Sequence, residues 1–242
     1  MSRTHSRGSC TFCGREFARG GISRHLQTCP KRQEAQTEAG HSRRRRQSLY
    51  HLQVQDAWSG DFWLHLEMRG EDTLQELDDY LRAIWLECCG HLSAFEIGEI
   101  HYTQIFDDGV SFGEERSLAV RVRDVFVPGA KIPYEYDFGS TTELVIKVVS
   151  ERQGRPTTSH PIVLMARSKL EPMPCLVCGK PAAWLCLQCM YDREDEACQF
   201  CEEHINEHME EQGHNDYGGP MPIVNSPRMG VCGYTGPAEP PY

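Results

Sequence analysis

Twelve cysteines and eleven histidines supply this chain with metal ligands, and most of the cysteines come in pairs. Cys10 and Cys13 are followed by His25 and Cys29. Zinc favours a tetrahedron of thiolates and imidazoles, and a tight turn between two cysteines lets both sulfurs face one ion. His25 and Cys29 are four residues apart, so they share one face of a helix that we expect to begin near residue 19. The spacing predicts a zinc site.

The stretch CTFCGREFARGGISRHLQTC, residues 10–29, resembles a zinc finger with Cys-Cys-His-Cys ligation and has Phe17, Ile22 and Leu26 as a small core. It contains one residue fewer between its ligand pairs than a DNA-reading finger. Nucleic-acid contact, protein contact and a purely structural role are all open for it. The candidate nucleic-acid-binding residues are Arg15, Arg19 and Arg24 in the finger and the run Arg43, Arg44, Arg45 and Arg46 after it.

A denser set of ligands lies near the C-terminus, with three C-x-x-C pairs and three histidines. In a reducing compartment such pairs favour metal binding over disulfides, with a redox dithiol as the competing interpretation. Eight ligands make two closed zinc sites, which leave no position for an activated water and are therefore structural. The set comprises Cys175, Cys178, Cys186, Cys189, Cys198, Cys201, His204, His208 and His214.

The order of these residues is similar to a B-box zinc module, in which the ligand pairs interleave. The resemblance implies that one ion is held by Cys175, Cys178, Cys198 and Cys201, and the other by Cys186, Cys189, His208 and His214. His204 and His208 are also four residues apart on an expected helix, so they are the alternative second pair, leaving His214 without a role.

Charge divides the chain into two parts. Residues 1–48 hold eleven Lys and Arg against three Asp and Glu, whereas residues 49–242 hold fourteen against thirty-two. The basic segment suits phosphate, because each Lys or Arg near a nucleic-acid backbone releases counterions. Residues 175–216, with ten acidic residues against two basic ones, suit a protein partner instead. Residues 31–48 show no apolar periodicity and predict a disordered basic linker.

The centre of the chain predicts a sheet with a helix. Residues 62–70, FWLHLEMRG, alternate as a half-buried strand does, and Thr73 with Glu76 forms a capping pattern for a helix reaching about residue 89. Residues 95–105, 117–127, 131–138 and 142–150 are rich in β-branched and aromatic side chains and predict further strands. The expected class is α+β, with a central mixed sheet and a packed helix flanked by two small zinc-binding modules. The helical apolar positions are Leu74, Leu77, Leu81, Ile84, Trp85 and Cys88.

Three stretches of this centre, TLQELDDYLRAIW (73–85), HLSAFEIG (91–98) and YEYDFG (134–139), carry a family resemblance. In this order they are similar to the helix, the HLH-x-F-like segment and the YDFGD-x-W motif of the plasmid root-inducing ORF-three-like domain family. The resemblance covers about residues 50–155 and implies a link to mobile elements, with no activity to transfer. After Gly139 the sequence reads STTEL, without the family's acidic residue and tryptophan.

Three cysteines fall outside the predicted sites. We expect Cys88 and Cys89 to pack in the helix, and Cys232 to be a packed residue, a substitute ligand or a reactive thiol. The apolar runs are far shorter than the roughly 20 residues of a membrane span, and no apolar segment follows the basic N-terminus. We therefore expect a cytoplasmic protein with no membrane contact.

The expected organisation is a finger (1–30), the basic linker (31–48), the ORF-three-like α+β domain (49–170) and a B-box-like two-zinc module with a packed tail (171–242). The first functional hypothesis is a non-enzymatic protein with three zinc ions that associates with nucleic acid through its N-terminal part. The second is an adaptor that binds protein through its acidic C-terminal module. The third, an enzyme in the central domain, requires a pocket near Tyr136, Asp137 and His91.

Overall fold

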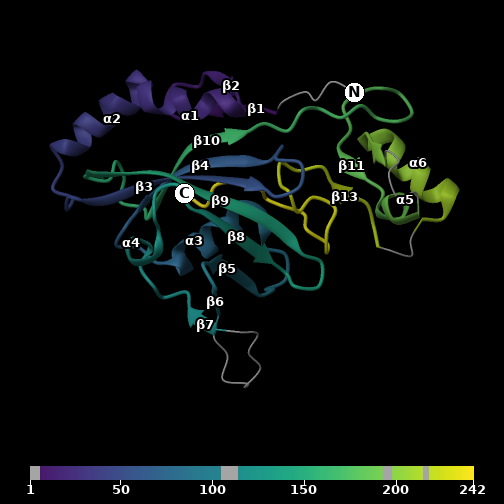
Figure 1. Cartoon of the computed structure of the whole chain (residues 1–242). Coiled ribbons are helices and arrows are strands. Elements are labelled where there is room, and N and C mark those ends of the chain that lie inside the picture. The colour runs from purple at the N-terminus through teal and green to yellow at the C-terminus, as the bar shows by residue number, and fades with distance from the viewer. Residues whose placement is uncertain (1–5, 105–113, 193–197, 215–217) are drawn as a thin grey trace.

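The computed structural model describes residues 6–104, 114–192, 198–214 and 218–242 (Figure 1). Over these residues the fold is α+β, as the sequence predicted. The strands are β1 (Arg7–Cys10), β2 (Glu16–Ala18), β3 (Gln47–Asp56), β4 (Trp63–Arg69), β5 (Ser93–Ile97), β6 (Ile100–Thr103), β7 (Glu114–Ser117), β8 (Lys131–Tyr136), β9 (Thr142–Gly154), β10 (Ile162–Ser168), β11 (Trp184–Leu185), β12 (Gln199–Phe200) and β13 (Met221–Pro222). The helices are α1 (Arg19–Thr28), α2 (Pro30–Gly40), α3 (Leu74–Leu81), the π-helical turn η1 (Arg82–Leu86), α4 (Val122–Val125), α5 (Leu187–Asp192) and α6 (Glu202–Gln212).

The centre is a ten-stranded sheet in the order β2-β1-β10-β4-β3-β9-β8-β5-β6-β7. Its neighbouring strands run antiparallel except for β6 and β7. A second, small sheet has the order β12-β11-β13. The first two strands of the large sheet come from the N-terminal finger, so the finger continues the central sheet instead of hanging from it.

Helix α3 and the turn η1 cover one face of this sheet. Thr73 and Glu76 form the predicted capping box, in which the Thr73 hydroxyl accepts from the Glu76 amide and the Glu76 carboxylate accepts from the Thr73 amide. The predicted apolar positions from Leu74 to Trp85 are all buried against the sheet, whereas Cys88 is only half-buried beyond the helix end. The capping box and the helical spacing therefore predicted the start and the buried face of this element correctly, whereas its end lies at Leu86 and not near residue 89.

The segment 117–127, predicted as a strand, is mainly loop with the short helix α4. Its backbone carbonyls serve the start of α3 instead of a neighbouring strand. The Val120 carbonyl accepts from the Leu74 amide at 3.1 Å, and the Leu118 carbonyl accepts from the Gln75 amide at 3.0 Å. The first amides of a helix have no hydrogen-bond acceptors within the helix, so this segment supplies the acceptors.

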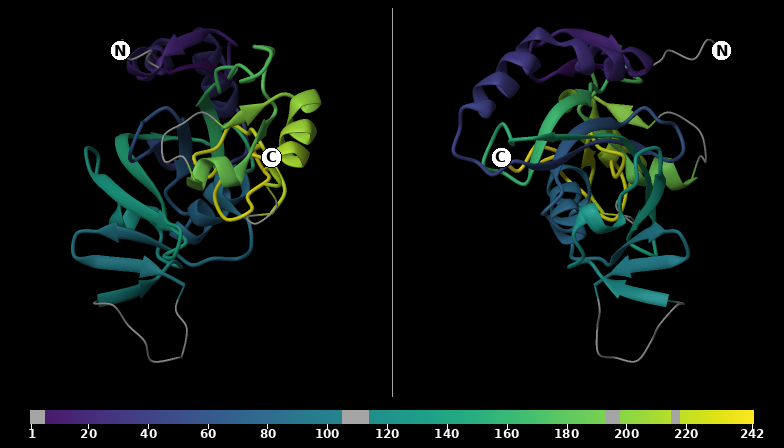
Figure 2. Two further views of the ribbon diagram at one scale, coloured as in Figure 1. Left: turned by 90° about the vertical axis from the view of Figure 1, so that its right-hand side faces the viewer. Right: turned by 60° about the vertical axis from the view of Figure 1, so that its left-hand side comes forward.

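On the other face of the sheet, the finger and α2 cover the part formed by β10 and β4. β1 pairs with β10, and Trp63, Met165 and Ala166 join the core of the finger. Both views in Figure 2 show α1 and α2 along one side of the molecule, away from β5, β6 and β7. Strand β4 is therefore buried on both faces, not on one as its alternation predicted.

The linker prediction was wrong for its first part, because residues 30–40 form α2. Pro30 stands at the start of the helix, where its missing amide costs nothing. The buried guanidinium of Arg32 donates to the Leu26 carbonyl and pairs with Glu67 on β4 at 3.0 Å. Glu67 also accepts two hydrogen bonds from Arg152 on β9. A polar contact, invisible to apolar periodicity, fixes this helix to the sheet.

The C-terminal module consists of the small sheet with α5 and α6, and its buried core is dominated by cysteines with Leu185, Phe200, Ile205 and Met209. The tail after β13 was expected to pack on this module. From residue 225 onward it also packs on the central domain: the Trp85 indole donates to the Asn225 carbonyl, and the Ser226 hydroxyl donates to the Trp85 carbonyl at 2.6 Å. The tail (yellow in Figures 1 and 2) therefore joins the two parts.

No helix in the described part of the chain is long and apolar enough to cross a bilayer.

Two histidines are buried together under the finger side of the sheet. His51 Nε2 on β3 lies 2.8 Å from His65 Nδ1 on β4. Burial, with a smaller contribution from the positive charge of Arg32, lowers the pKa of both imidazoles from 6.5 to about 3, and His51 also contributes to the shift of His65. In the folded protein both rings are therefore neutral across the range in which free histidine titrates.

This pair predicts a loss of stability in acid. The unfolded chain takes up protons below its pKa of 6.5 while the folded chain does not, so the free energy of unfolding falls between pH 6.5 and about pH 3. We expect His51→Gln to remove one histidine's contribution to this pH dependence, which is about 1.4 kcal/mol of unfolding free energy per pH unit in that window. In urea unfolding, the difference in free energy of unfolding between wild type and variant should be constant above pH 6.5 and should become smaller below it. A gap independent of pH would contradict the buried pair.

A second prediction concerns the union of the finger with the sheet. A Cβ atom at Gly8 would overlap the Arg167 carbonyl oxygen and the Trp63 indole. We expect Gly8→Ala to lower the free energy of unfolding by about 1–3 kcal/mol, the usual cost of overpacking. Gly21→Ala in α1 is the control, because nothing lies within 4 Å of its Cβ position and alanine favours a helix. Equal stability of both variants would show that β1 does not pack on the sheet as described.

Candidate metal centres

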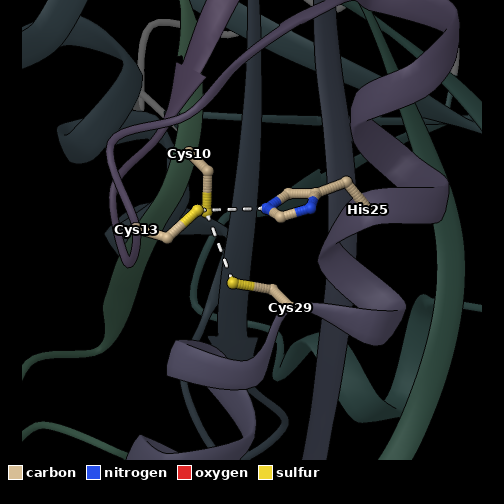
Figure 3. Close-up of side chains that lie close together, drawn as sticks. All are labelled: Cys10, Cys13, His25 and Cys29. Carbon is tan, nitrogen blue, oxygen red and sulfur yellow. Dashed lines mark hydrogen bonds between the residues drawn. The ribbon is translucent and has the colours of Figure 1, made fainter.

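The first cluster joins the turn after β1 to helix α1 (Figure 3). The Gly14 amide donates to the Cys10 carbonyl at 2.8 Å, closing the turn that carries Cys10 and Cys13. Cys10 Sγ lies 3.9 Å from Cys29 Sγ, and Cys13 Sγ lies 3.3 Å from His25 Nε2. All four ligand atoms lie within 4.8 Å of one another. The structure thus brings together the four residues that the sequence selected.

These separations suit one tetrahedral ion. Zinc–sulfur bonds of about 2.3 Å place two sulfurs roughly 3.8 Å apart in a regular tetrahedron. Burial, with a smaller contribution from Arg15, lowers the pKa of His25 and favours the neutral imidazole that ligates a metal. Burial also raises the pKa of Cys10 to about 11, so that its thiolate needs a compensating positive charge.

The second cluster contains Cys175, Cys178, Cys201 and His204. Cys178 Sγ lies 3.8 Å from Cys201 Sγ, and His204 Nδ1 lies 3.2 Å from Cys201 Sγ and 3.7 Å from Cys175 Sγ. For Cys175, the cost of burying the thiolate is outweighed by the backbone amides of Cys178, Cys201 and Val177, which together lower its pKa to about 6. This thiol is therefore poised to ligate as a thiolate.

One member of this cluster differs from the prediction, because His204 lies where Cys198 was expected. Cys201 is the N-cap of α6, so His204 comes one turn later and lies over it. Cys198 is buried at the opposite end of β12 from Cys201, and its carbonyl accepts from the Cys186 amide at 2.9 Å. Among the described residues Cys198 belongs to none of the Cys and His groups. The interleaved order of ligand pairs holds, but the partner of Cys201 is a histidine.

The third cluster contains Cys186, Cys189, His208 and His214, as the B-box resemblance implied. Cys189 Sγ lies 3.3 Å from His208 Nε2, and Cys186 Sγ lies 3.3 Å from His214 Nδ1. Helix α6 ends at Gly213, whose φ of 66° turns the chain back so that His214 approaches His208. The alternative pairing of His204 with His208 is not formed, since the two lie in different clusters.

The predicted nucleic-acid-binding arginines are mostly exposed. Arg24 lies on the outer side of α1, and Arg15 lies over the Phe17 ring at 5.4 Å. Arg19 is half-buried and donates to the Gly60 carbonyl at 2.6 Å, so it serves the contact between finger and central domain. The exposed run after α2 is Arg43, Arg44, Arg45 and Arg46, of which Arg44 donates to the Pro156 carbonyl at 3.4 Å.

A fourth group, Cys88, Cys89, His91 and Cys232, was missed by sequence reasoning. Three of its members lie within four residues and form a C-C-x-H string. Its two cysteines were expected to pack in the helix because Cys88 continued the apolar period, and His91 was assigned to the HLH-x-F-like segment. Cys232 lies 141 residues beyond His91 and has no local signal, so only the folded chain shows the association.

Comparisons with known proteins agree with the central resemblance. The family model described as plasmid pRiA4b ORF-3-like protein matches residues 49–215, which is well beyond residue 155 and includes the second and third clusters. The chain is also similar to a crystal structure of a protein of unknown function from Methanosarcina mazei Go1, with 20% identity and a TM-score of 0.42. That likeness covers 47% of this chain and 66% of the other. No curated protein matches the chain.

The assignment of His204 over Cys198 can be tested by counting metal. We expect His204→Asn to bind one zinc ion fewer than the wild-type chain, because it removes one ligand from the second cluster. Cys198→Ser should retain the wild-type count and serves as the control. Native mass spectrometry of both proteins gives the counts directly. If Cys198→Ser lost an ion and His204→Asn kept all of its ions, the ligands would instead be the four cysteines that the sequence predicted.

Proposed function

The chain belongs to the plasmid pRiA4b ORF-3-like family, and from this premise we propose a zinc-binding, non-enzymatic protein that associates with nucleic acid through its N-terminal part. The family name refers to a plasmid reading frame, which supports a link to mobile elements. Zinc is the metal that fits best, because the first three clusters of the structure each combine thiolate with imidazole. Such ligands favour a reducing compartment such as the cytoplasm, where thiols persist.

The proposed zinc ions are structural. Each predicted cluster offers four protein ligands, and a closed tetrahedron leaves no position for an activated water. In the first cluster the ion would fasten the turn after β1 to α1, and in the other two it would fasten the small sheet and its turns to α6. The zinc ions would thereby hold surfaces in place instead of reacting.

The basic surface carries the nucleic-acid part of the proposal. The finger and the arginine run are connected by the helix α2, which is fixed to the sheet through Arg32 and Glu67. An eleven-residue helix is about 16 Å long, which is roughly the length of five base pairs, so α2 separates the arginine run from the finger along the chain. Cationic groups at a fixed spacing bind along a phosphate backbone more favourably than groups joined by a flexible tether.

Protein binding through the C-terminal module is the second candidate. The outer side of α6 exposes Glu202, Glu203, Glu207, Glu210 and Glu211, which would repel phosphate. Beside the Cys175–Cys178 turn, Leu176 is 49% exposed and Val177 is 62% exposed. Exposed apolar side chains with an acidic surround suit a protein partner.

The test of nucleic-acid binding uses charge-matched variants of the full chain. We expect Arg45→Ala/Arg46→Ala to weaken binding to duplex DNA or RNA and to reduce the slope of log K against log salt by about 2. Lys131→Ala/Lys147→Ala is the control, because it removes the same charge from exposed, paired positions of β8 and β9. Absence of binding by the wild type, or equal effects of the two double variants, would overturn the proposal and favour the protein-binding candidate.

A further inference from the structure

The fourth Cys and His group lies where the C-terminal tail meets the central domain. Cys88 and Cys89 follow the end of η1, His91 precedes β5, and Cys232 comes from the tail. Cys89 Sγ lies 3.8 Å from Cys88 Sγ and 3.9 Å from Cys232 Sγ. His91 Nε2 lies 2.9 Å from Cys89 Sγ and 3.2 Å from Cys232 Sγ. All four ligand atoms lie within 4.8 Å of one another.

The sulfur separations match a tetrahedral zinc site and not a disulfide. Two sulfurs bound to one zinc ion lie roughly 3.8 Å apart, whereas a disulfide bond is about 2.05 Å long. The nitrogen–sulfur separations are shorter than the roughly 3.6 Å of a zinc tetrahedron, so His91 must move outward by a few tenths of an ångström to admit the ion. Three thiols and one imidazole are a frequent ligand set for structural zinc.

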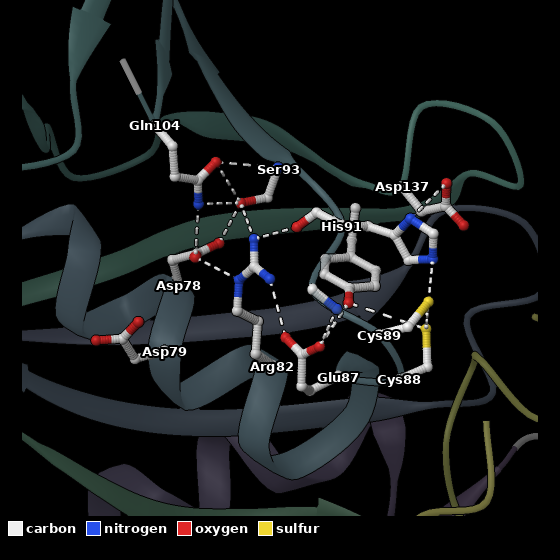
Figure 4. Close-up of polar contacts among 12 residues, drawn as sticks. Asp78, Asp79, Arg82, Glu87, Cys88, Cys89, His91, Ser93, Gln104 and Asp137 are labelled. Carbon is white, nitrogen blue, oxygen red and sulfur yellow. Dashed lines mark hydrogen bonds and ion pairs between the residues drawn. The ribbon is translucent and has the colours of Figure 1, made fainter. Parts of the chain in front are cut away.

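The loop that carries three of these ligands is held by a buried polar network (Figure 4). Asp78 on α3 is fully buried and pairs with Arg82 at 2.6 Å. Arg82 donates to the His91 carbonyl at 2.7 Å and pairs with Glu87, whose carboxylate accepts from the Gly90 amide at 2.6 Å. Both ends of the loop are therefore fixed to Arg82 at the start of η1, which Asp78 ties to α3, so metal binding would need little further ordering of the loop.

The other ring nitrogen of His91 has a carboxylate partner. His91 Nδ1 lies 3.4 Å from Asp137 Oδ1, and the buried guanidinium of Arg228 holds Asp137 Oδ2 at 2.5 Å. A carboxylate on the remote nitrogen orients a metal-binding histidine and fixes its tautomer. The Arg228 guanidinium also lies 3.5 Å from Cys88 Sγ, where its positive charge offsets the negative charge of clustered thiolates. The arrangement is that of a metal site with its supporting contacts.

We propose that Cys88, Cys89, His91 and Cys232 bind a further zinc ion, which fastens the C-terminal tail to the central domain. Three ligands lie within the residues matched by the family model, whereas Cys232 lies beyond residue 215. The segment that matches the family model thus supplies three ligands, and the tail of this chain supplies the fourth. This zinc ion is separate from the three of the proposed function, and it depends on none of them.

The test counts zinc in the full chain after reconstitution with zinc alone. Native mass spectrometry should find four ions in the wild type, and three in both Cys232→Ser and Cys89→Ser. Cys198→Ser is the matched control and should retain four, because it removes a cysteine that belongs to no described cluster. Amide hydrogen exchange around residues 229–234 should become faster in Cys232→Ser, while exchange in α1 and α6 should not change.

Other outcomes would overturn the proposal. One is an unchanged zinc count in Cys232→Ser, and another is a wild-type chain that lacks two hydrogens relative to its reduced mass with no fourth ion. Because both substituted cysteines are exposed, misfolding does not explain a lost ion as long as the other three remain. A loss of ions from Cys10→Ser alone would bear on the proposed function and leave this site untouched.

Discussion

The buried guanidinium of Arg228 is the contact on which the joining of the parts depends. It comes from the tail, yet it donates to Asp137, Thr142 and the Ser140 carbonyl, all in the central domain. It also lies over the Tyr136 ring at 4.9 Å. A charge taken out of water is stable only when its hydrogen bonds are nearly complete, and losing one partner of such a pair typically costs about 3–5 kcal/mol. Any other placement of the tail would separate Arg228 from these partners, so the contact fixes the position of the tail on the central domain.

The small modules bury clusters of Cys and His side chains where the central domain buries an apolar core. The finger and the C-terminal module bury few apolar side chains, and cysteines make up much of what they do bury. Units of this size usually need a metal or disulfides to fold. The finger has a second support, because β1 extends the large sheet and Trp63 fills its core. Its position relative to the central domain is therefore set by backbone pairing and by the packing of Trp63.

The predictions from sequence succeeded where the signal was local. The capping box at Thr73, the alternation in β8 and the C-x-x-C turns that begin at Cys10, Cys175 and Cys186 each involve residues close in the chain. They failed where a distant partner decided the outcome. Helix α2 is fixed by the pair of Arg32 and Glu67, and Cys232 meets His91 only after the tail has docked. The replacement of Cys198 by His204 depended on where α6 begins, which is uncertain from sequence by a residue or two.

The central motif shows why the family segment alone does not describe this chain. Tyr136 and Asp137 belong to the YDFG string, and both are buried in contact with Arg228. Asp137 adopts a φ of 64°, a strained conformation for a residue other than glycine that surrounding contacts must maintain. Those contacts come from the Gly139 amide, His91 and Arg228. The motif thus provides a docking position for the tail.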